Sequence, residues 1–297
     1  MPARLILNAD DFGLTPGINR AIAELHASGA LTSATLMANG PAFDDAIRIA
    51  RAQPTIGIGC HIVLTDGTPL SPPGTIPTLL GRDRKSFRPS LTDFFLAVLI
   101  GKVSEADIAR EAQAQIQRLQ HAGIQITHVD THKHTHILKR IARPLLAICE
   151  RMGVQAIRNP FEPRWSIALG KSPILRRLQL RSLRHLRPSF LALPQIRDGR
   201  VRTTSGTLGI SATGHLNPTT LRTTLNAMPG GTWELVCHPG YNDRDLDAVT
   251  TRLRATRDIE RAALLEAFSS VSSQETHPPL PELINYREVA QLAAADG

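Results

Sequence analysis

The sequence predicts an α/β fold, a sheet or barrel of parallel strands with the helices on the outside. Short apolar runs that are typical of buried strands alternate with amphipathic helical patterns at least four times in residues 4–158. Acidic or histidine side chains lie at or near the ends of several runs, where parallel α/β proteins build their functional sites. With 297 residues, of which 42% are hydrophobic, the chain can bury a large core, and we expect one domain over residues 1–297.

The first apolar run, Arg4–Ala9, predicts a strand that ends in Asp10 and Asp11. A helix follows, with Thr15 as its N-cap and Pro16 at its first helical position. Two adjacent carboxylates at the end of an apolar strand are costly to bury unless their charge is compensated, and a metal ion would compensate it. The alternative is a solvated turn in which one of the two carboxylates caps the helix.

The alternation continues through the middle of the chain. His61 lies inside the strand-like run 56–64, where a lone histidine is more often a core residue, but the other polar clusters favour a ligand. The connection 66–90 is rich in Pro, Gly and Thr, which predicts a lid, a binding loop or a disordered piece. The apolar segment 91–103 is expected to pack on the body or on a partner subunit in a homodimer. The other elements expected here are a strand at 31–37 and helices at 42–51 and 104–121.

Four histidines and one aspartate occupy alternate positions after a strand-like start at 124–127. In an extended backbone, alternate side chains share one face, so we expect these five side chains to lie together. Several imidazoles beside a carboxylate suit a divalent metal ion, a proton-transfer site or both. The alternative is a histidine-rich surface loop. The five residues are His128, Asp130, His132, His134 and His136.

A basic segment at 163–202 interrupts the rhythm, after a predicted helix at 141–152 and a predicted strand at 154–158. It holds nine arginines and one lysine, Lys171, against a single acidic residue, Asp198. The pattern is typical of a helix that binds a membrane surface or another anionic partner, and the alternative is a solvated helix packed on the body. The leucines that fall roughly on one helical face are Leu175, Leu178, Leu183 and Leu186.

The last third of the chain returns to alternating elements. The strand-like run 232–238 ends in His238, which places another imidazole at the carboxyl end of a strand. Asn285 is predicted to cap a final helix. The other elements expected here are strands at 208–210 and 282–284 and helices at 218–228 and 247–268.

Composition and charge narrow the function classes. The net charge of +8 indicates an acidic partner, but two Trp and two Tyr offer few stacking platforms, which argues against nucleic acid. The three cysteines form no CxxC pair and predict reduced thiols. A thiol nucleophile at Cys237, beside His238, is disfavoured because adjacent strand residues face opposite sides. The longest apolar run, 94–100, is far below the ~18 residues of a membrane span, and no signal peptide is apparent, so we expect a cytoplasmic protein, soluble or membrane-peripheral.

The polar positions at strand ends form one constellation. Parallel topology brings Asp10, Asp11, His61, the 128–136 cluster and His238 together in space. Carboxylates and imidazoles from separate strands make an open metal site, where a metal ion activates water and polarises a carbonyl. A second carboxylate can act as base, and a distant histidine can protonate a leaving amine. The inventory fits metal-assisted hydrolysis of an amide or an ester.

These residues carry a resemblance to a known family. The chain resembles the YdjC-like carbohydrate deacetylases, which include chitooligosaccharide deacetylase and the hopanoid-associated deacetylase. The combination of motifs, with their order and spacing, makes the resemblance specific, although any one motif alone would be weak. The matching pieces are Asn8–Gly13, Gly59–Thr65, His128–His136, His238–Gly240 and Glu282–Tyr286.

The resemblance implies a distorted (β/α) barrel of the NodB-like kind and a divalent metal ion. It implies that Asp11, His61 and His132 hold the metal ion and that Asp10 is the general base. The family is associated with Mg²⁺, whereas two imidazoles and one carboxylate suit Zn²⁺ by ligand softness. The reaction implied is removal of acetyl from an N-acetylated sugar, such as an N-acetylglucosamine oligosaccharide or a hopanoid-linked glycolipid. From its position alone, we expect His238 to be the general acid.

Further residues are expected to line the substrate pocket or to orient the metal ligands. They are Asp130, His134, His136 and Arg158. The segment 163–202 departs from the family, which leaves the acceptor sugar open. Two other classes also stay open. One is an amidohydrolase in which His134 and His136 form an HxH metal pair, and the other is a non-catalytic basic protein that binds a membrane or nucleic acid.

Overall fold

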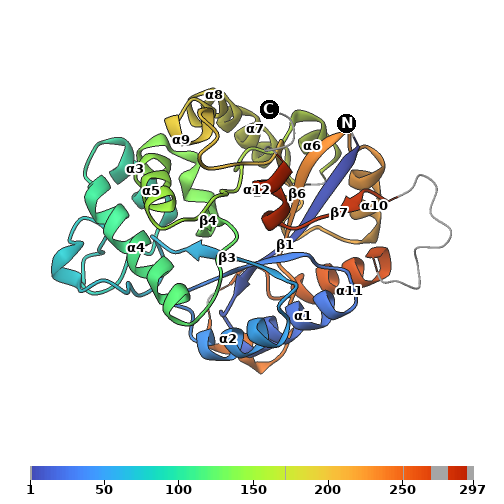
Figure 1. The fold of residues 1–297 in the computed structure, drawn as a ribbon, viewed down its shortest axis with the longest axis horizontal. Helices are drawn as coiled ribbons and strands as arrows, with labels where there is room; N and C mark the ends of the chain where they lie inside the picture. The colour runs from blue at the N-terminus through green and yellow to red at the C-terminus, as the bar shows by residue number, and fades with distance from the viewer. Residues whose placement is uncertain (1, 171, 250, 269–279, 293–297) are drawn as a thin grey trace.

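The computed structural model confirms the predicted α/β architecture. It describes residues 2–170, 172–249, 251–268 and 280–292, so the predicted basic residue Lys171 lies outside the described residues. Within these ranges, seven parallel strands form one curled sheet with helices on its outer side (Figure 1). The order is β4-β3-β2-β1-β6-β5, and β7 pairs with the beginning of β1. The strands are β1 Ala3–Phe12, β2 Ser33–Leu36, β3 Gly57–Ile62, β4 Val129–Thr131, β5 Gly206–Leu208, β6 Gly231–Cys237 and β7 Glu282–Leu283.

The central strand β1 carries an irregularity at its carboxyl end. Its register with β2 shifts between Ala9 and Phe12, which places a bulge at Asp10 and Asp11. Asp11 has φ 65°, a left-handed conformation that non-glycine residues rarely adopt. In a regular strand, successive side chains face opposite sides. The bulge instead brings both carboxylates within 4.8 Å of a ring nitrogen of His61.

The gap between β4 and β5 is closed irregularly. In place of the strand predicted at 154–158, Ile157 forms a single bridge to β4 and Ala156 a single bridge to Arg202. Pro160 follows at once, and its missing N–H prevents a regular ladder from extending. The result is the distorted, incomplete barrel that the sequence predicts.

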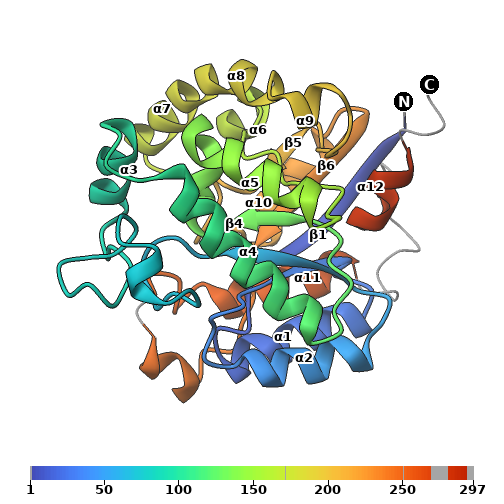
Figure 2. The ribbon, with the colours of Figure 1, turned by 60° about the vertical axis from the view of Figure 1, so that its left-hand side comes forward.

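Most helices begin and end near their predicted positions. Thr15 Oγ1 accepts a hydrogen bond from the Ile18 N–H and Asn285 Oδ1 accepts one from the Arg287 N–H, so both predicted N-caps are present. The helix predicted at 247–268 is shorter, because a separate 3₁₀ turn precedes it. Figure 2 shows α4 and α5 packed side by side outside the sheet. The helices are α1 Pro16–Ala27, α2 Phe43–Ala52, α3 Leu91–Leu99, α4 Glu105–His121, α5 Lys139–Arg151, α6 Arg164–Leu169, α7 Ile174–Leu183, α8 Arg187–Leu191, α9 Pro194–Arg197, α10 Pro218–Asn226, α11 Arg257–Phe268 and α12 Tyr286–Leu292.

The histidine-rich stretch is a strand only at its beginning. β4 ends at Thr131, and the chain continues as a 3₁₀ segment, His132–Ile137, in which Lys133 and His134 have φ 57° and 52°. The Thr131 hydroxyl oxygen accepts a hydrogen bond from the His136 N–H at 3.1 Å, which folds the chain back on itself. The prediction that five alternate side chains share one strand face is therefore wrong beyond Thr131.

The basic segment 163–202 forms the short helices α6 to α9 rather than one amphipathic helix. Proline stands in the first turn of both α8 and α9, where it is tolerated, and so prevents one continuous helix. Of the four leucines predicted to share a face, Leu183 and Leu186 pack against the core, whereas Leu175 and Leu178 are exposed. No helix in the described part of the chain combines the length and apolarity that crossing a membrane requires.

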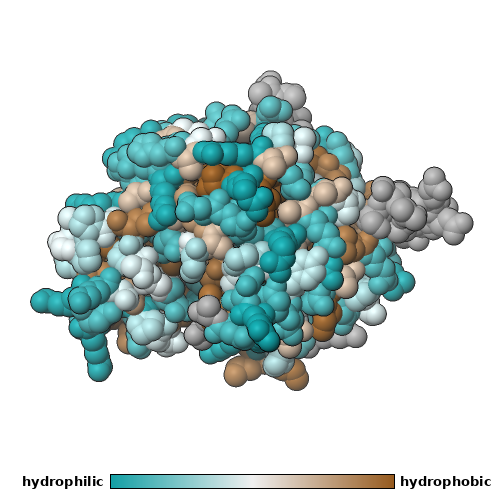
Figure 3. Space-filling view, turned by 90° about the horizontal axis from the view of Figure 1, so that it is seen from below, coloured by the Kyte–Doolittle hydropathy of each residue, from teal (hydrophilic) through white to brown (hydrophobic). Residues whose placement is uncertain are grey.

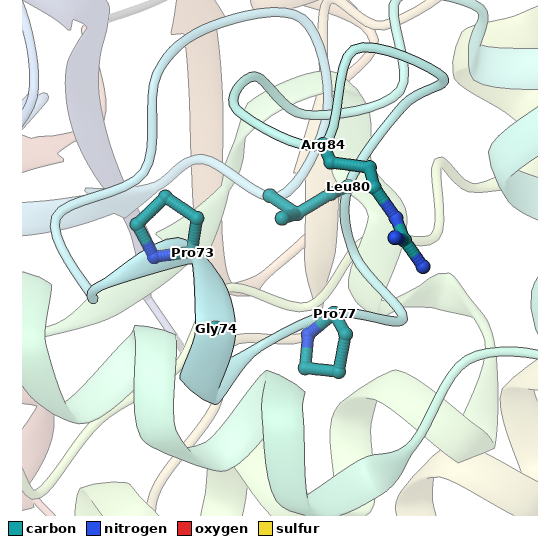
Figure 4. A pocket seen from close by; sticks show the side chains of 5 residues that line it. All are labelled: Pro73, Gly74, Pro77, Leu80 and Arg84. Carbon is teal, nitrogen blue, oxygen red and sulfur yellow. The ribbon is translucent and has the colours of Figure 1, made fainter.

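The long connection 66–90 is attached to α4. Both carboxylate oxygens of Glu111 accept backbone hydrogen bonds, from Leu70 at 3.0 Å and from Ser71 at 2.9 Å. The connection also encloses a hollow that contains none of the predicted site residues (Figure 4). Its lining residues are Pro73, Gly74, Pro77, Leu80 and Arg84.

A first prediction concerns Gly59 in β3. A Cβ at this position would lie 2.5 Å from Cε1 of His128, whose ring stacks on Tyr286 with 3.7 Å between ring centroids. Because both rings are buried, we expect Gly59→Ala to lower the free energy of unfolding by about 1–3 kcal/mol in urea denaturation. Gly74→Ala is the matched control, since a Cβ there meets no atom within 4 Å. Equal losses in both variants would contradict the prediction.

Candidate active site

Three potential metal ligands meet at the carboxyl edge of the sheet. Asp11 comes from the end of β1, His61 from β3 and His132 from the turn after β4. His61 Nε2 lies 3.2 Å from His132 Nδ1 and 3.8 Å from Asp11 Oδ1, and the last two atoms are 3.7 Å apart. The three donor atoms lie within 4.8 Å of one another, which is a set that can bind a divalent cation. The structure thus brings together the three residues that the sequence predicts as ligands.

Asp130 fixes the orientation of His61. The His61 Nδ1–H donates to Asp130 Oδ1 at 2.8 Å, which leaves Nε2 as the nitrogen for a metal ion. Burial lowers the pKa of His61, but the Asp130 carboxylate outweighs burial and raises that pKa to about 9. Burial lowers the pKa of His132 to about 4, so this ring is neutral. The site therefore attracts positive charge, which a metal cation can supply in place of a proton.

Asp10 lies beside the potential ligands and is held by Arg158. The guanidinium donates from Nη2 to Asp10 Oδ1 at 2.7 Å and from Nη1 to Oδ2 at 2.9 Å. Asn8 Nδ2 and Thr35 Oγ1 each donate to Oδ1 at 3.1 Å. Burial alone would raise the pKa of Asp10, but the guanidinium holds that pKa well below its usual range. Asp10 is therefore an ionised carboxylate in a fixed orientation.

Arg158 is the centre of a buried ion network. It has no exposed surface and pairs with Asp10, Asp130 and Glu234, and Glu234 Oε2 also accepts the Tyr286 hydroxyl at 2.5 Å. Asp10, His61 and Asp130 also bring donor atoms within 4.8 Å of one another, but Arg158 already neutralises both of these carboxylates, so this set suits a cation less well than Asp11, His61 and His132. Because Arg158 is fully buried, it is placed to orient the carboxylates of Asp10 and Asp130, which is one of its two predicted roles.

His238 faces Asp10 from the end of β6. Its Nε2 lies 3.8 Å from Asp10 Oδ2, and its side chain keeps 13% of its surface exposed. The His238 N–H donates to Glu260 Oε2 at 2.7 Å. Its Nδ1 lies 4.0 Å from the same oxygen and has no hydrogen-bond partner among the described residues. The imidazole can therefore exchange a proton with a group bound beside Asp10.

Two residues of α11 that the sequence did not predict complete the site. Arg257 Nη2 donates to Asp11 Oδ2 at 2.6 Å, and Glu260 holds the backbone of His238. Both side chains are buried on the same stripe of α11 as Leu264. The sequence feature that could have indicated Arg257 and Glu260 is their spacing, because both charged residues occupy positions of the apolar stripe of this helix.

The two later histidines of the cluster do not form a metal pair. His136 Nδ1 lies 2.6 Å from Thr131 Oγ1 and its Nε2 lies 3.1 Å from the Arg158 carbonyl oxygen. Both nitrogens are engaged, which argues against the HxH site of an amidohydrolase. His136 also makes no hydrogen bond to His132 in the described structure. His134 is half-buried with an unpartnered Nδ1 among the described atoms, and burial holds its pKa well below the usual range.

The buried thiols of Cys60 and Cys237 are not activated as nucleophiles. Cys237 Sγ lies 3.3 Å from the carbonyl oxygen of Asn8, and burial raises the pKa of this thiol. Burial likewise raises the pKa of Cys60. Protonated, buried thiols are poor nucleophiles, so the structure agrees with the exclusion of Cys237 as a nucleophile.

Fold and site together define an α/β barrel protein with a candidate metal centre of one carboxylate and two imidazoles. The chain belongs to the YdjC-like protein family, whose model matches residues 4–276.

Several known proteins are similar to this chain. A protein of Brevibacillus brevis named carbohydrate deacetylase is 40% identical over 53% of this chain and 60% of its own length. A carbohydrate deacetylase of Thermoanaerobacter pseudethanolicus is 27% identical over 88% of this chain and 90% of its own length. A crystal structure from Enterococcus faecalis V583, of a protein proposed to cleave cellobiose phosphate, aligns with a TM-score of 0.74 at 25% identity. That alignment covers 97% of this chain and 99% of the other.

A second prediction concerns the buried guanidinium. Arg158→Met leaves three carboxylates buried without their counter-ion, so we expect the free energy of unfolding to fall by about 3–5 kcal/mol. Urea denaturation followed by circular dichroism measures the loss. Arg143→Met is the control, because Arg143 pairs with Glu105 on the surface and its removal should cost much less stability than the removal of Arg158. A loss of similar size in the two variants would show that Arg158 is not a structural counter-ion.

Proposed function

We propose that this protein is a metal-dependent hydrolase that removes the acetyl group from an N-acetylated sugar. The observation that carries the proposal is the convergence of Asp11, His61 and His132 beside the Asp10 carboxylate and the His238 imidazole. Relatives named carbohydrate deacetylases support a carbohydrate substrate and an acetyl group as the one removed.

The proposed ligands are Asp11 Oδ1, His61 Nε2 and His132 Nδ1. A divalent ion bound there supplies Lewis-acid activation of water and of the acetyl carbonyl. Asp130 keeps His61 Nε2 directed at the site, and Arg257 engages only Oδ2 of Asp11, so Oδ1 stays available. The donor types suit Zn²⁺ by softness and also admit Mg²⁺, and we propose one of these two ions.

Proton transfer is assigned to the two groups that flank the ligands. Asp10 is proposed as the general base that takes a proton from the attacking water, and Arg158 keeps this carboxylate ionised and in place. His238 is proposed as the general acid that protonates the leaving amine. The 3.8 Å between Asp10 Oδ2 and His238 Nε2 is too long for a direct hydrogen bond, yet short enough for both groups to act on one substrate.

Glu260 is proposed as the positioning residue for the acid. Its two oxygens accept backbone N–H groups, from Gly214 at 3.2 Å and from His238 at 2.7 Å. The second contact fixes the backbone that carries the imidazole.

A third prediction tests the ligands. Asp11→Ala, His61→Ala and His132→Ala should each lose bound metal, and acetate release from N-acetylglucosamine oligosaccharides should fall at least about 10²-fold. Metal content is measured after chelation and reloading with Mg²⁺ or Zn²⁺, and acetate is measured enzymatically. Cys237→Ala is the control and should keep both metal and activity. Full turnover in all three ligand variants would refute the assignment, and bound metal without acetate release would redirect the search to other amides or esters.

A fourth prediction tests Glu260. A glutamine offers one acceptor oxygen for two backbone donors, so Glu260→Gln should lower kcat by about tenfold and leave KM and metal content unchanged. Steady-state kinetics on the metal-loaded enzyme separates these quantities. Glu266→Gln, an exposed position on the same helix, serves as the control. A change in KM or in metal content with unaltered kcat would refute the proposed positioning role.

A further inference from the structure

Large apolar side chains on the surface are concentrated on two helices. Among the described residues, seven large hydrophobic side chains are exposed, and six of these lie on α3, at its C-cap or on α7. Leu175 is 79% exposed and Ile174 71%, and the three on or next to α3 are 56–62% exposed. The six residues are Leu96, Leu99, Ile100, Ile174, Leu175 and Leu178, and the seventh is Ile259.

The spacing of these residues makes a stripe on each helix. Leu96 is followed at three and four residues by Leu99 and Ile100, and Leu178 follows Leu175 and Ile174 by three and four residues. Residues at these spacings share one helical face. The opposite face of each helix is already used, since Phe94 and Val98 of α3 and Leu180 of α7 are buried. Figure 3 shows another face of the molecule, seen from below, which is largely teal with only small brown patches.

Positive charge accompanies both stripes. Arg176 and Arg181 are exposed on α7, which contains no acidic residue. Lys102 follows α3 in the sequence. The Arg140 guanidinium also lies beside Gly101, because its Nη1 would be 3.5 Å from a Cβ built on that glycine. The one acidic residue of α3 is in its first turn, at the end remote from Leu99 and Ile100. Apolar side chains among cations fit a partner that offers hydrocarbon and anions together.

Both helices arise at the edge of the sheet that carries the candidate site. α3 belongs to the connection that leaves the carboxyl end of β3, and α7 follows the segment that begins after Arg158. Lys133 Nζ pairs with Asp66 Oδ2 at 2.9 Å, and Arg184 Nη1 donates to the Glu162 carbonyl oxygen at 2.6 Å. The first contact ties the connection of α3 to the residue that follows His132, and the second ties the end of α7 to the segment that follows Arg158. α3 and α7 lie in the same half of the molecule in Figures 1 and 2.

We propose that α3 and α7 form a docking surface for an anionic lipid bilayer. The aliphatic stripes enter the headgroup region, and the arginines bind lipid phosphates. A second copy of the chain fits less well, because a symmetric contact through α7 would set Arg176 and Arg181 against the same residues of the partner. Nucleic acid would satisfy the arginines but would leave six aliphatic side chains without a role. The inference deepens the proposed function and rests on it in one respect, which is that the acetylated sugar is presented to the site at the membrane surface.

Vesicle co-sedimentation of the full chain tests the docking surface. The probes are vesicles of phosphatidylcholine alone and vesicles of phosphatidylcholine with phosphatidylglycerol. We expect binding to the anionic vesicles, with a partition coefficient at least about tenfold higher than for the neutral ones and a decrease at high salt. Absence of binding, or equal binding to both compositions, overturns the proposal.

Paired variants identify the residues that bind. Leu175→Ser with Leu178→Ser, Leu99→Ser with Ile100→Ser, and Arg176→Gln with Arg181→Gln should each lower the partition coefficient roughly tenfold. Ile259→Ser removes the seventh exposed aliphatic side chain, on a different helix, and should have no effect. Unchanged binding in the α3 and α7 variants overturns the proposal. A dimer in light scattering that these variants disrupt, without vesicle binding by the native chain, would assign the surface to a second copy instead.

A parallel assay separates this inference from the proposed function. Acetate release from a soluble N-acetylglucosamine oligosaccharide is measured without vesicles for the native chain and all variants. Active protein that does not bind anionic vesicles refutes the docking surface alone. Protein that binds vesicles through the named residues, yet releases no acetate from soluble or lipid-linked sugars, refutes the proposed function alone.

Discussion

One buried guanidinium holds the site together. Arg158 lies among Asp10, Asp130 and Glu234, which would repel one another strongly in an interior that excludes water. Without this cation, the repulsion would be relieved at the lowest free-energy cost by protonating one of the carboxylates. Protonation would remove either the candidate base, Asp10, or the hydrogen-bond acceptor that orients His61, Asp130. The same contacts therefore join β1, β4 and β6 and keep the candidate base Asp10 ionised. This explains why the Arg158 side chain, although charged and next to the bridge residue Ile157, is among the most buried of the described residues.

The bulge in β1 gives its two neighbouring carboxylates different surroundings and therefore different proposed roles. Asp10 has both oxygens engaged by Arg158, so it is poorly placed to be a metal ligand. Asp11 is engaged at Oδ2 alone, by Arg257, and its Oδ1 faces the two imidazoles. Each aspartate thus has its own arginine, and the number of oxygens left free differs between them. Without a bulge, the second side chain would point into the other face of the sheet.

The sequence allowed the fold and the convergence of polar side chains at one edge of the sheet to be predicted, because both depend on local patterns. The choice of Asp11, His61 and His132 as ligands came from the family resemblance. Alternating apolar runs define strands and helices, and the end of a parallel strand fixes on which edge Asp11 or His61 lies. The turn after Thr131 was missed, since it depends on a side-chain hydrogen bond that competes with the strand. Arg257 and Glu260 were missed for a different reason. Their partners lie far away in sequence, and charged residues on a helix are solvated by default.

The position of Tyr286 has a consequence for the order in which the protein matures. Its hydroxyl donates a hydrogen bond to Glu234, and its ring stacks on His128, so the ion network around Arg158 uses a residue that follows every candidate site residue in the sequence. When residue 240 has just emerged from the ribosome, every candidate ligand and both candidate proton-transfer groups have already emerged. The nascent chain at that stage has neither this tyrosine nor β7. The ion network around Glu234 can therefore close only after residue 286 has been translated, which keeps the candidate site incomplete for some time after its own residues have been made.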